Sequence, residues 1–94
     1  VQDALARGYR LGFTAGRDSH PMEHGIEGGI LGAFIPSLTR ENVFDSLYNR
    51  FVYGTTGARI LLSLRVNGCN MGEEITAKPE QPLQIEVSKG VACA

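Results

Sequence analysis

The sequence contains no tryptophan, only two cysteines and no long hydrophobic run, and its charges nearly cancel. The two cysteines, Cys69 and Cys93, are too few for a disulfide framework, so two ordinary thiols are the favoured interpretation and one bridge stays open. A net charge of −1 gives no basic surface, and we therefore expect no nucleic-acid and no anionic-membrane partner. No apolar stretch reaches the ~18 residues that a membrane-spanning helix needs.

The chain is short and of ordinary composition. Its 94 residues suit one domain or a piece of one, and 43% of them are hydrophobic, as in many globular proteins. The start at Val1 shows no basic segment followed by a hydrophobic one, so no signal peptide is visible. We expect a soluble protein; its compartment and the length of the native polypeptide stay open.

The first half of the chain alternates between expected helices and apolar strands. We expect the end of a helix over residues 1–7, a strand over residues 10–16 and a loop over residues 21–28. Residues 29–35 are almost wholly apolar, which is typical of a strand that is covered on both faces, and Pro36 ends it.

The clearest helix follows. Ser37 or Thr39 can cap its N-terminus, and Glu41 suits the first turn of a helix. A stripe of residues spaced by four, widened by two aromatic neighbours, predicts its buried face. The stripe consists of Val43, Leu47 and Phe51, with Phe44 and Tyr48 beside them.

The hydrophobic period changes near Gly57. From Ile60 to Val66, and again from Leu83 to Val87, apolar residues recur at every second position, which indicates half-buried antiparallel strands. Asn67-Gly68 is a strong turn signal, and residues 78–82 carry two prolines and predict a loop. We therefore place a boundary at residue 57 and expect an α+β fold: α/β units over residues 1–57, then an incomplete β-domain over residues 58–94.

An acidic residue and a histidine follow the expected strand over residues 10–16. Asp18 and His20 are two positions apart, so on an extended chain they point the same way, as ligands of an oxygen/nitrogen metal site do. A catalytic zinc site needs three protein ligands and a water, and His24 or Glu23 completes the set only if the loop folds back. A solvated pair that binds no metal is the alternative.

Other candidate sites are weaker. Ser19 faces away from His20 on a strand, which argues against a hydrolase triad, and no catalytic residue can be assigned. Residues 54–57 could cradle an anion with backbone amides, but a tight connection is favoured. Arg59 could contact a phosphate, with an interdomain salt bridge as the favoured alternative.

These residues carry a family resemblance. Gly16-Arg17-Asp18-Ser19-His20 resembles the last metal-binding motif, glycine–serine–aspartate–x–histidine, of the PHP (polymerase and histidinol phosphatase) superfamily. Later segments are similar to a PHP-like family in which a β-domain follows the barrel; they are residues 38–47, Tyr53-Gly54-Thr55-Thr56-Gly57-Ala58-Arg59-Ile60, Val66-Asn67-Gly68 and Met71-Gly72.

The resemblance implies the last units of a seven-stranded α/β barrel followed by antiparallel strands. It also implies a divalent metal (Zn, Mn or Fe) in the parent protein, with Asp18 and His20 among its ligands and a metal-bound hydroxide that attacks a phosphoester. The other ligand motifs of the family are not in this chain, so metal binding by the chain alone is expected to be weak or absent. Arg17 departs from the motif, which has serine at that position.

Two functions are therefore open. The first is the C-terminal fragment of a PHP-like metal-dependent hydrolase that is inactive alone and whose partner is the rest of the parent barrel. The second is a non-enzymatic interaction module that forms a homo-oligomer through strand edges, because the alternating pattern still runs at residues 83–91.

Overall fold

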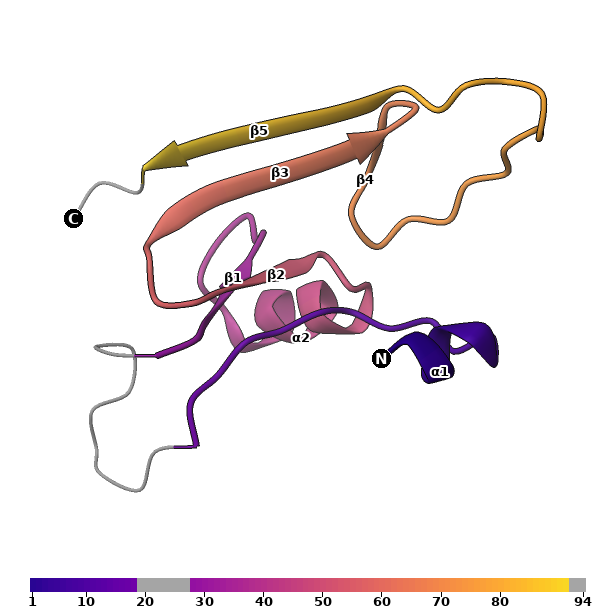
Figure 1. The fold of residues 1–94 in the computed structure, drawn as a ribbon. Coiled ribbons are helices and arrows are strands. Elements are labelled where there is room, and N and C mark those ends of the chain that lie inside the picture. Colours follow the sequence, from indigo (N-terminus) through magenta and orange to yellow (C-terminus); the bar gives the residue numbers. More distant parts are fainter. Residues whose placement is uncertain (19–27, 92–94) are drawn as a thin grey trace.

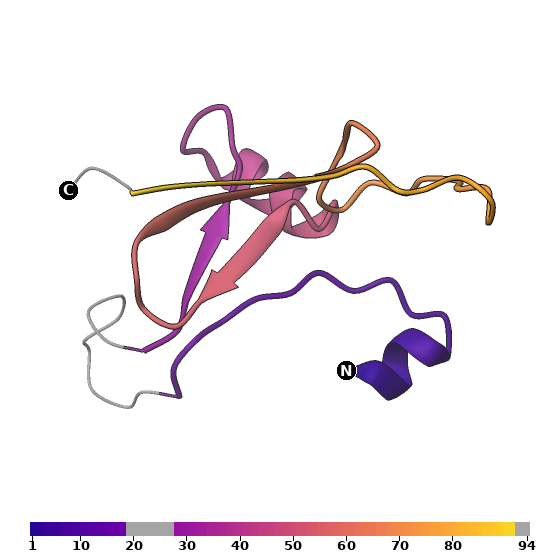
Figure 2. The ribbon, with the colours of Figure 1, turned by 45° about the horizontal axis from the view of Figure 1, so that its top comes forward.

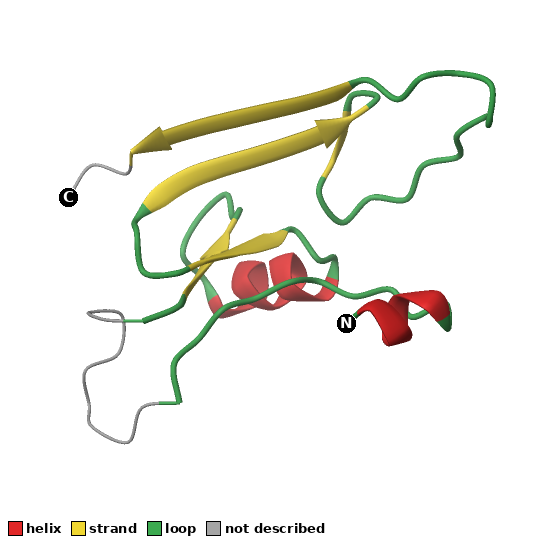
Figure 3. Cartoon of the chain, viewed as in Figure 1, coloured by secondary structure: helices red, strands yellow, loops and turns green. Residues whose placement is uncertain are grey.

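The computed structural model describes residues 1–18 and 28–91. Two antiparallel sheets and two short helices make up this part of the chain (Figures 1 and 3). The elements are α1 (Gln2–Ala6), β1 (Ile30–Ala33), α2 (Arg40–Tyr48), β2 (Val52–Thr55), β3 (Ile60–Val66), β4 (Cys69–Asn70) and β5 (Ile85–Val91). Figure 2 shows β5 running along β3, with α1 to one side of both sheets.

The first sheet is a ribbon of β1 and β2, paired from Ile30 with Thr55 to Ala33 with Val52. Aromatic rings pack at one end of it: Phe34 stacks on Phe51 with centroids 4.6 Å apart and lies 5.7 Å from the ring of Tyr53. Val52 is the buried hydrophobic residue of the described chain, at 5% exposure. The core is therefore small and centred on this ribbon.

Helix α2 begins and packs through short polar side chains. Of the two predicted caps, Ser37 and Thr39, it is Thr39 that caps the helix, by accepting a hydrogen bond from the Asn42 backbone amide at 3.2 Å. Ser46 is buried, and its hydroxyl donates to the Phe51 carbonyl at 2.9 Å, which ties the helix to the start of β2. The small Ser46 side chain lets the helix approach closely, so the buried face of α2 is centred on it.

The predicted buried face of α2 is therefore wrong for three of its five residues. Phe51 does pack in the aromatic cluster, but Leu47 is 41% exposed, and the aromatic residues of the helix, Phe44 and Tyr48, are 63% and 73% exposed. They lie about half a turn around the helix from Ser46, because successive residues are set about 100° apart. Spacing by four located an apolar stripe but not which side of the helix meets the sheet.

The second sheet has the order β4-β3-β5. Its register places Ile60 opposite Val91 and Val66 opposite Ile85. Residues with the same parity share one face of a sheet, so the alternating apolar residues of β3 and β5 line a single face. Asn67 and Gly68 both have positive φ, 51° and 80°, which builds the tight β3–β4 turn that the sequence predicted.

The fold prediction of terminal α/β-barrel units is wrong. A barrel of that type needs parallel neighbouring strands, whereas β1 pairs with β2 in antiparallel fashion, and both sheets of the described residues are antiparallel. Residues 10–16, predicted as a strand, form neither a helix nor a strand and belong to neither sheet. A short apolar run such as Ile30–Ala33 fits a buried parallel strand or an antiparallel one equally well, and Leu31 is exposed rather than covered. The boundary at residue 57 stays a prediction.

Tyr53 connects the two sheets. Its hydroxyl donates to the Ile60 carbonyl at 2.7 Å, and its ring lies over Gly32, its cross-strand neighbour. We expect Tyr53→Phe to lower the free energy of unfolding by about 1 kcal/mol, because the Ile60 carbonyl loses its donor. Chemical denaturation measures the change, and Tyr48→Phe, at an exposed ring, is the matched control. Equal stability of the two variants would contradict the assignment.

Within the described residues, no helix is long and apolar enough to cross a membrane.

Candidate functional site

The segment that leads to Asp18 lies tightly against the β1–β2 ribbon. We call residues 12–17 the strap. A Cβ atom added at Gly54 would lie 2.7 Å from the Ala15 Cβ and 2.8 Å from the Ala15 amide nitrogen, and one added at Gly29 would lie 2.9 Å from the Gly16 nitrogen. Real Cβ atoms do not approach other atoms this closely, so these two glycines are what allow the strap to lie on the ribbon.

The end of the strap is fixed in the same way. The Arg17 side chain packs over Gly28, where an added Cβ would meet its Cδ at 2.9 Å. Gly28 has φ of +83°, a conformation that suits glycine. Asp18 is exposed and follows Arg17 directly, so its backbone is held beside the end of the ribbon where Ile30 pairs with Thr55.

Only one of the predicted metal ligands lies among the residues that the structure describes. Asp18 lies at the end of the strap, whereas His20 and His24 lie outside the described residues. Among residues 1–18 and 28–91, no group of three His, Cys, Asp or Glu side chains could hold a metal ion. The structure thus fixes the place of one predicted ligand and leaves the pair as a prediction.

The turn after β2 closes on itself. The Thr55 hydroxyl donates to the Ala58 carbonyl at 2.9 Å and accepts from the Gly57 amide at 3.2 Å. A Cβ atom at Gly57 would lie 2.9 Å from the Gly28 carbonyl oxygen, so the turn also packs against the start of β1. This arrangement favours the tight connection over the anion cradle.

Arg59 follows that turn and is exposed. It lines a shallow hollow of about 210 Å³ between the two sheets, together with Ile30, Leu31, Gly32, Tyr53, Thr55, Ile60 and Leu61. The lining is mostly apolar. The phosphate contact suggested for Arg59 stays a prediction.

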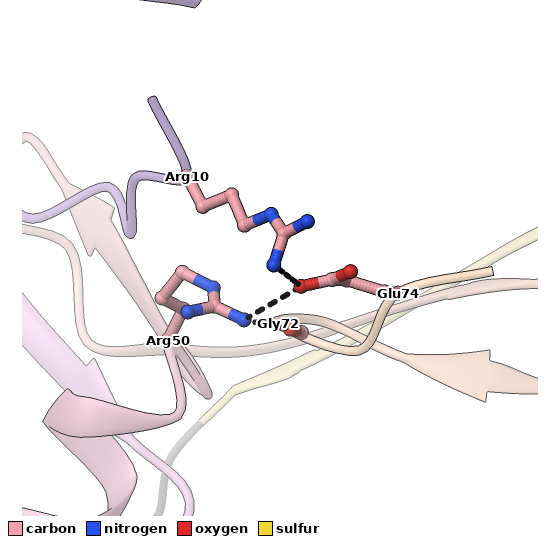
Figure 4. A network of polar contacts seen from close by, with 4 residues as sticks. All are labelled: Arg10, Arg50, Gly72 and Glu74. Atoms are coloured by element: carbon pink, nitrogen blue, oxygen red, sulfur yellow. Dashed lines mark hydrogen bonds and ion pairs between the residues drawn. The ribbon is translucent and has the colours of Figure 1, made fainter. Parts of the chain in front are cut away.

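A polar network that the sequence did not predict joins three distant segments (Figure 4). The Glu74 carboxylate pairs with Arg10 at 2.7 Å and lies 4.0 Å from the Arg50 guanidinium, which also donates to the Gly72 carbonyl at 2.9 Å. Arg10 precedes the strap and Arg50 follows α2, so the network ties both to the turn after β4. No local pattern in the sequence predicts this network, because Arg10, Arg50 and Glu74 are more than 20 residues apart from one another.

The network borders an open cleft of about 530 Å³ lined by Asn49, Arg50, Phe51, Asn70, Met71, Gly72, Glu73 and Glu74. The Glu73 carboxylate accepts from the Asn70 amide, and Glu74 is paired with arginine. Because these carboxylates are already engaged, the cleft is better explained as a junction between segments than as a reaction site.

Comparison with known proteins gives a family but no activity. The model of a family described as "Protein of unknown function (DUF3604)" matches residues 10–93. An uncharacterised protein of Chlamydia trachomatis is 29% identical over 103 residues, covering 98% of this chain and 17% of the relative. An uncharacterised protein of Chlamydia pneumoniae is 30% identical over 105 residues, covering 98% of this chain and 17% of the relative.

The chain therefore spans about one sixth of the length of these relatives. No solved structure matches it. Since the family model extends over nearly the whole sequence, the chain belongs to the DUF3604 family of proteins of unknown function.

Proposed function

We propose that this chain supplies two metal ligands, Asp18 and His20, to a metal-dependent hydrolase of the phosphoesterase class. The remaining ligands would come from elsewhere in a longer polypeptide, and the chain alone would be inactive. The observation that carries the proposal is the strap, since close packing at Gly29 and Gly54 fixes the backbone that leads to Asp18. A ligand held on a fixed backbone loses little freedom on binding a cation.

The donor types fit a divalent metal, but their number does not suffice. A carboxylate and an imidazole suit Zn, Mn or Fe, and Asp18 is exposed. Two ligands fall short of the three that a catalytic zinc site uses. The relatives are about six times as long as the matched segment, which leaves ample sequence for the others. The resemblance of residues 16–20 to the last metal-binding motif of the PHP superfamily supports the same assignment.

In this proposal the chain binds and orients; it does not itself react. A bound metal would supply a hydroxide nucleophile and polarise a phosphoryl oxygen. Asp18 would provide an oxygen ligand and His20 a nitrogen ligand, and the strap would keep Asp18 from shifting. Arg17 packs over Gly28, on the side of the strap that meets the start of β1.

The test uses the natural polypeptide that carries this segment. We expect Asp18→Ala and His20→Ala each to lower both the metal content and the rate of hydrolysis of generic phosphoesters. Loss of a residue that only orients a metal ligand typically lowers metal affinity or activity by about 10–100-fold, and loss of a ligand itself should have a larger effect. Asp3→Ala, at an exposed carboxylate on α1, is the control and should leave both unchanged. Full metal content and turnover in both variants would refute the ligand assignment. Turnover by the 94-residue chain alone would refute its inactivity.

A second candidate, an interaction module, is favoured by strand β5. Every residue of β5 is exposed, and in the described part of the chain it pairs only with β3. Such an edge can pair with a second copy, giving a homo-oligomer. Lys89 shares the apolar face of β5 with Val87 and Val91, and a charge there opposes edge pairing, so this candidate ranks second. Sedimentation of the chain tests it: a monomer at every concentration would exclude self-pairing.

A further inference from the structure

Helix α2 presents aromatic side chains on the side that faces away from the sheet. Phe44 and Tyr48 lie about half a turn from the buried Ser46, and their rings are stacked with centroids 6.0 Å apart. Leu47 and the preceding Leu38 are exposed as well. We call these four residues, Leu38, Phe44, Leu47 and Tyr48, the outer face of α2.

Exposing the apolar side chains of this outer face to water is unfavourable. A helix that packs on one side places polar residues on the other, and one that is apolar on both sides is normally enclosed. The polar groups of α2 instead border the aromatic pair, with Arg40 on one flank and Glu41 and Asp45 on the other. An apolar centre with a charged rim is typical of an interaction surface.

We propose that the outer face of α2 is a docking surface for another part of the same polypeptide: an apolar element that carries a basic side chain. The occupant is placed within the polypeptide because the segment spans only about one sixth of the relatives that it matches. The basic group follows from the rim, because Asp45 lies three residues before Tyr48 and Glu41 three residues before Phe44, and at each of these places a cation can pair with a carboxylate and lie over an aromatic ring.

The proposal does not depend on metal binding. Asp18 follows the strap, whereas the outer face of α2 lies across the helix from the ribbon that the strap contacts. A polypeptide whose metal ligands are removed should therefore keep the docked helix. Failure of the docking proposal would likewise leave the role of Asp18 and His20 undecided.

The experiment introduces Phe44→Glu into the natural polypeptide that carries this segment and follows amide hydrogen exchange over α2. We expect faster exchange across residues 38–49 and a melting temperature lower by at least about 2 °C, because a buried aromatic is replaced by a charge. Phe44→Leu, which stays apolar, should keep most of the protection. Tyr9→Glu, at a ring that is 62% exposed and lies outside α2, is the matched control.

A second variant tests the charge of the occupant. Asp45→Lys, which leaves Glu41 in the first turn of α2, should also speed exchange over α2, whereas Arg40→Gln should not. Unchanged exchange in Phe44→Glu would show that the outer face stays in water and would overturn the proposal. A polypeptide whose mass falls by half in Phe44→Glu would identify a second copy as the occupant and would overturn it too.

Discussion

Replacing Gly54 with alanine is expected to displace the strap from the β1–β2 ribbon. The added Cβ would lie 2.7 Å from the Ala15 Cβ and 2.9 Å from the Thr14 carbonyl carbon, so the strap backbone has to move. Forcing a methyl group into a closely packed contact costs typically about 1–3 kcal/mol. For a chain of this size each kcal/mol lowers the melting temperature by about 4–8 °C. Denaturant titration of the variant measures the loss.

Gly16→Ala is the matched control for that substitution. Gly16 lies in the same strap, but an added Cβ there would have no atom within 4 Å. We expect its free energy of unfolding to stay within about 0.5 kcal/mol of the parent, as at other open surface positions. If Gly16→Ala destabilises as much as Gly54→Ala, the cost comes from the alanine in the strap or strand itself, and close packing of the strap on the ribbon is disproved.

The double variant Gly54→Ala with Ala15→Gly sharpens the test. It removes the Cβ–Cβ overlap at 2.7 Å but keeps the contact with the Ala15 nitrogen at 2.8 Å. We therefore expect partial recovery of stability, since interacting neighbours are not additive. In the longer polypeptide, Gly54→Ala should also weaken metal binding if the strap positions Asp18.

Local sequence signals predicted the elements better than their arrangement. The cap at Thr39 and the alternation from Ile60 to Val66 depend only on residues close together in the sequence. The structure has a helix directly after Thr39 and a strand over Ile60–Val66. Val52–Thr55 was missed as a strand because four residues with a glycine give almost no period. Its pairing with β1 is a contact between distant residues, and this contact decides that the sheet is antiparallel.

The candidate site shows the same division. Asp18 is predicted as a metal ligand because a carboxylate and an imidazole two residues apart form a local pattern, and that role stays a prediction. The glycines that hold its strap, Gly29 and Gly54, look like ordinary loop or strand glycines, and only the packed structure shows what they accommodate. The Arg10–Glu74 pair likewise joins residues that no local pattern connects.

Replacing Gly72 with alanine is expected to have the largest effect on the cleft beside α2. Gly72 has φ of +87°, and its added Cβ would run into the Asn49 carbonyl oxygen and lie 2.8 Å from the Arg50 carbonyl carbon. The left-handed conformation alone costs an L-residue about 1–2 kcal/mol. Overlap with backbone atoms adds a further amount of about 1–3 kcal/mol, because backbone cannot swing away as a side-chain tip can.

Gly68→Ala separates the two contributions to that loss. Gly68 has almost the same φ, +80°, but nothing lies within 4 Å of an added Cβ. Gly68→Ala should therefore lose only the stability that the left-handed conformation costs. The difference between the free energies of unfolding of the two variants, measured by denaturant titration, then gives the cost of the overlap at Gly72. The Arg50 guanidinium donates to the Gly72 carbonyl, so Gly72→Ala should also detach the turn after β4 from the end of α2. If both variants lose the same stability, that turn does not pack against α2, and the cleft between them is not part of the folded protein.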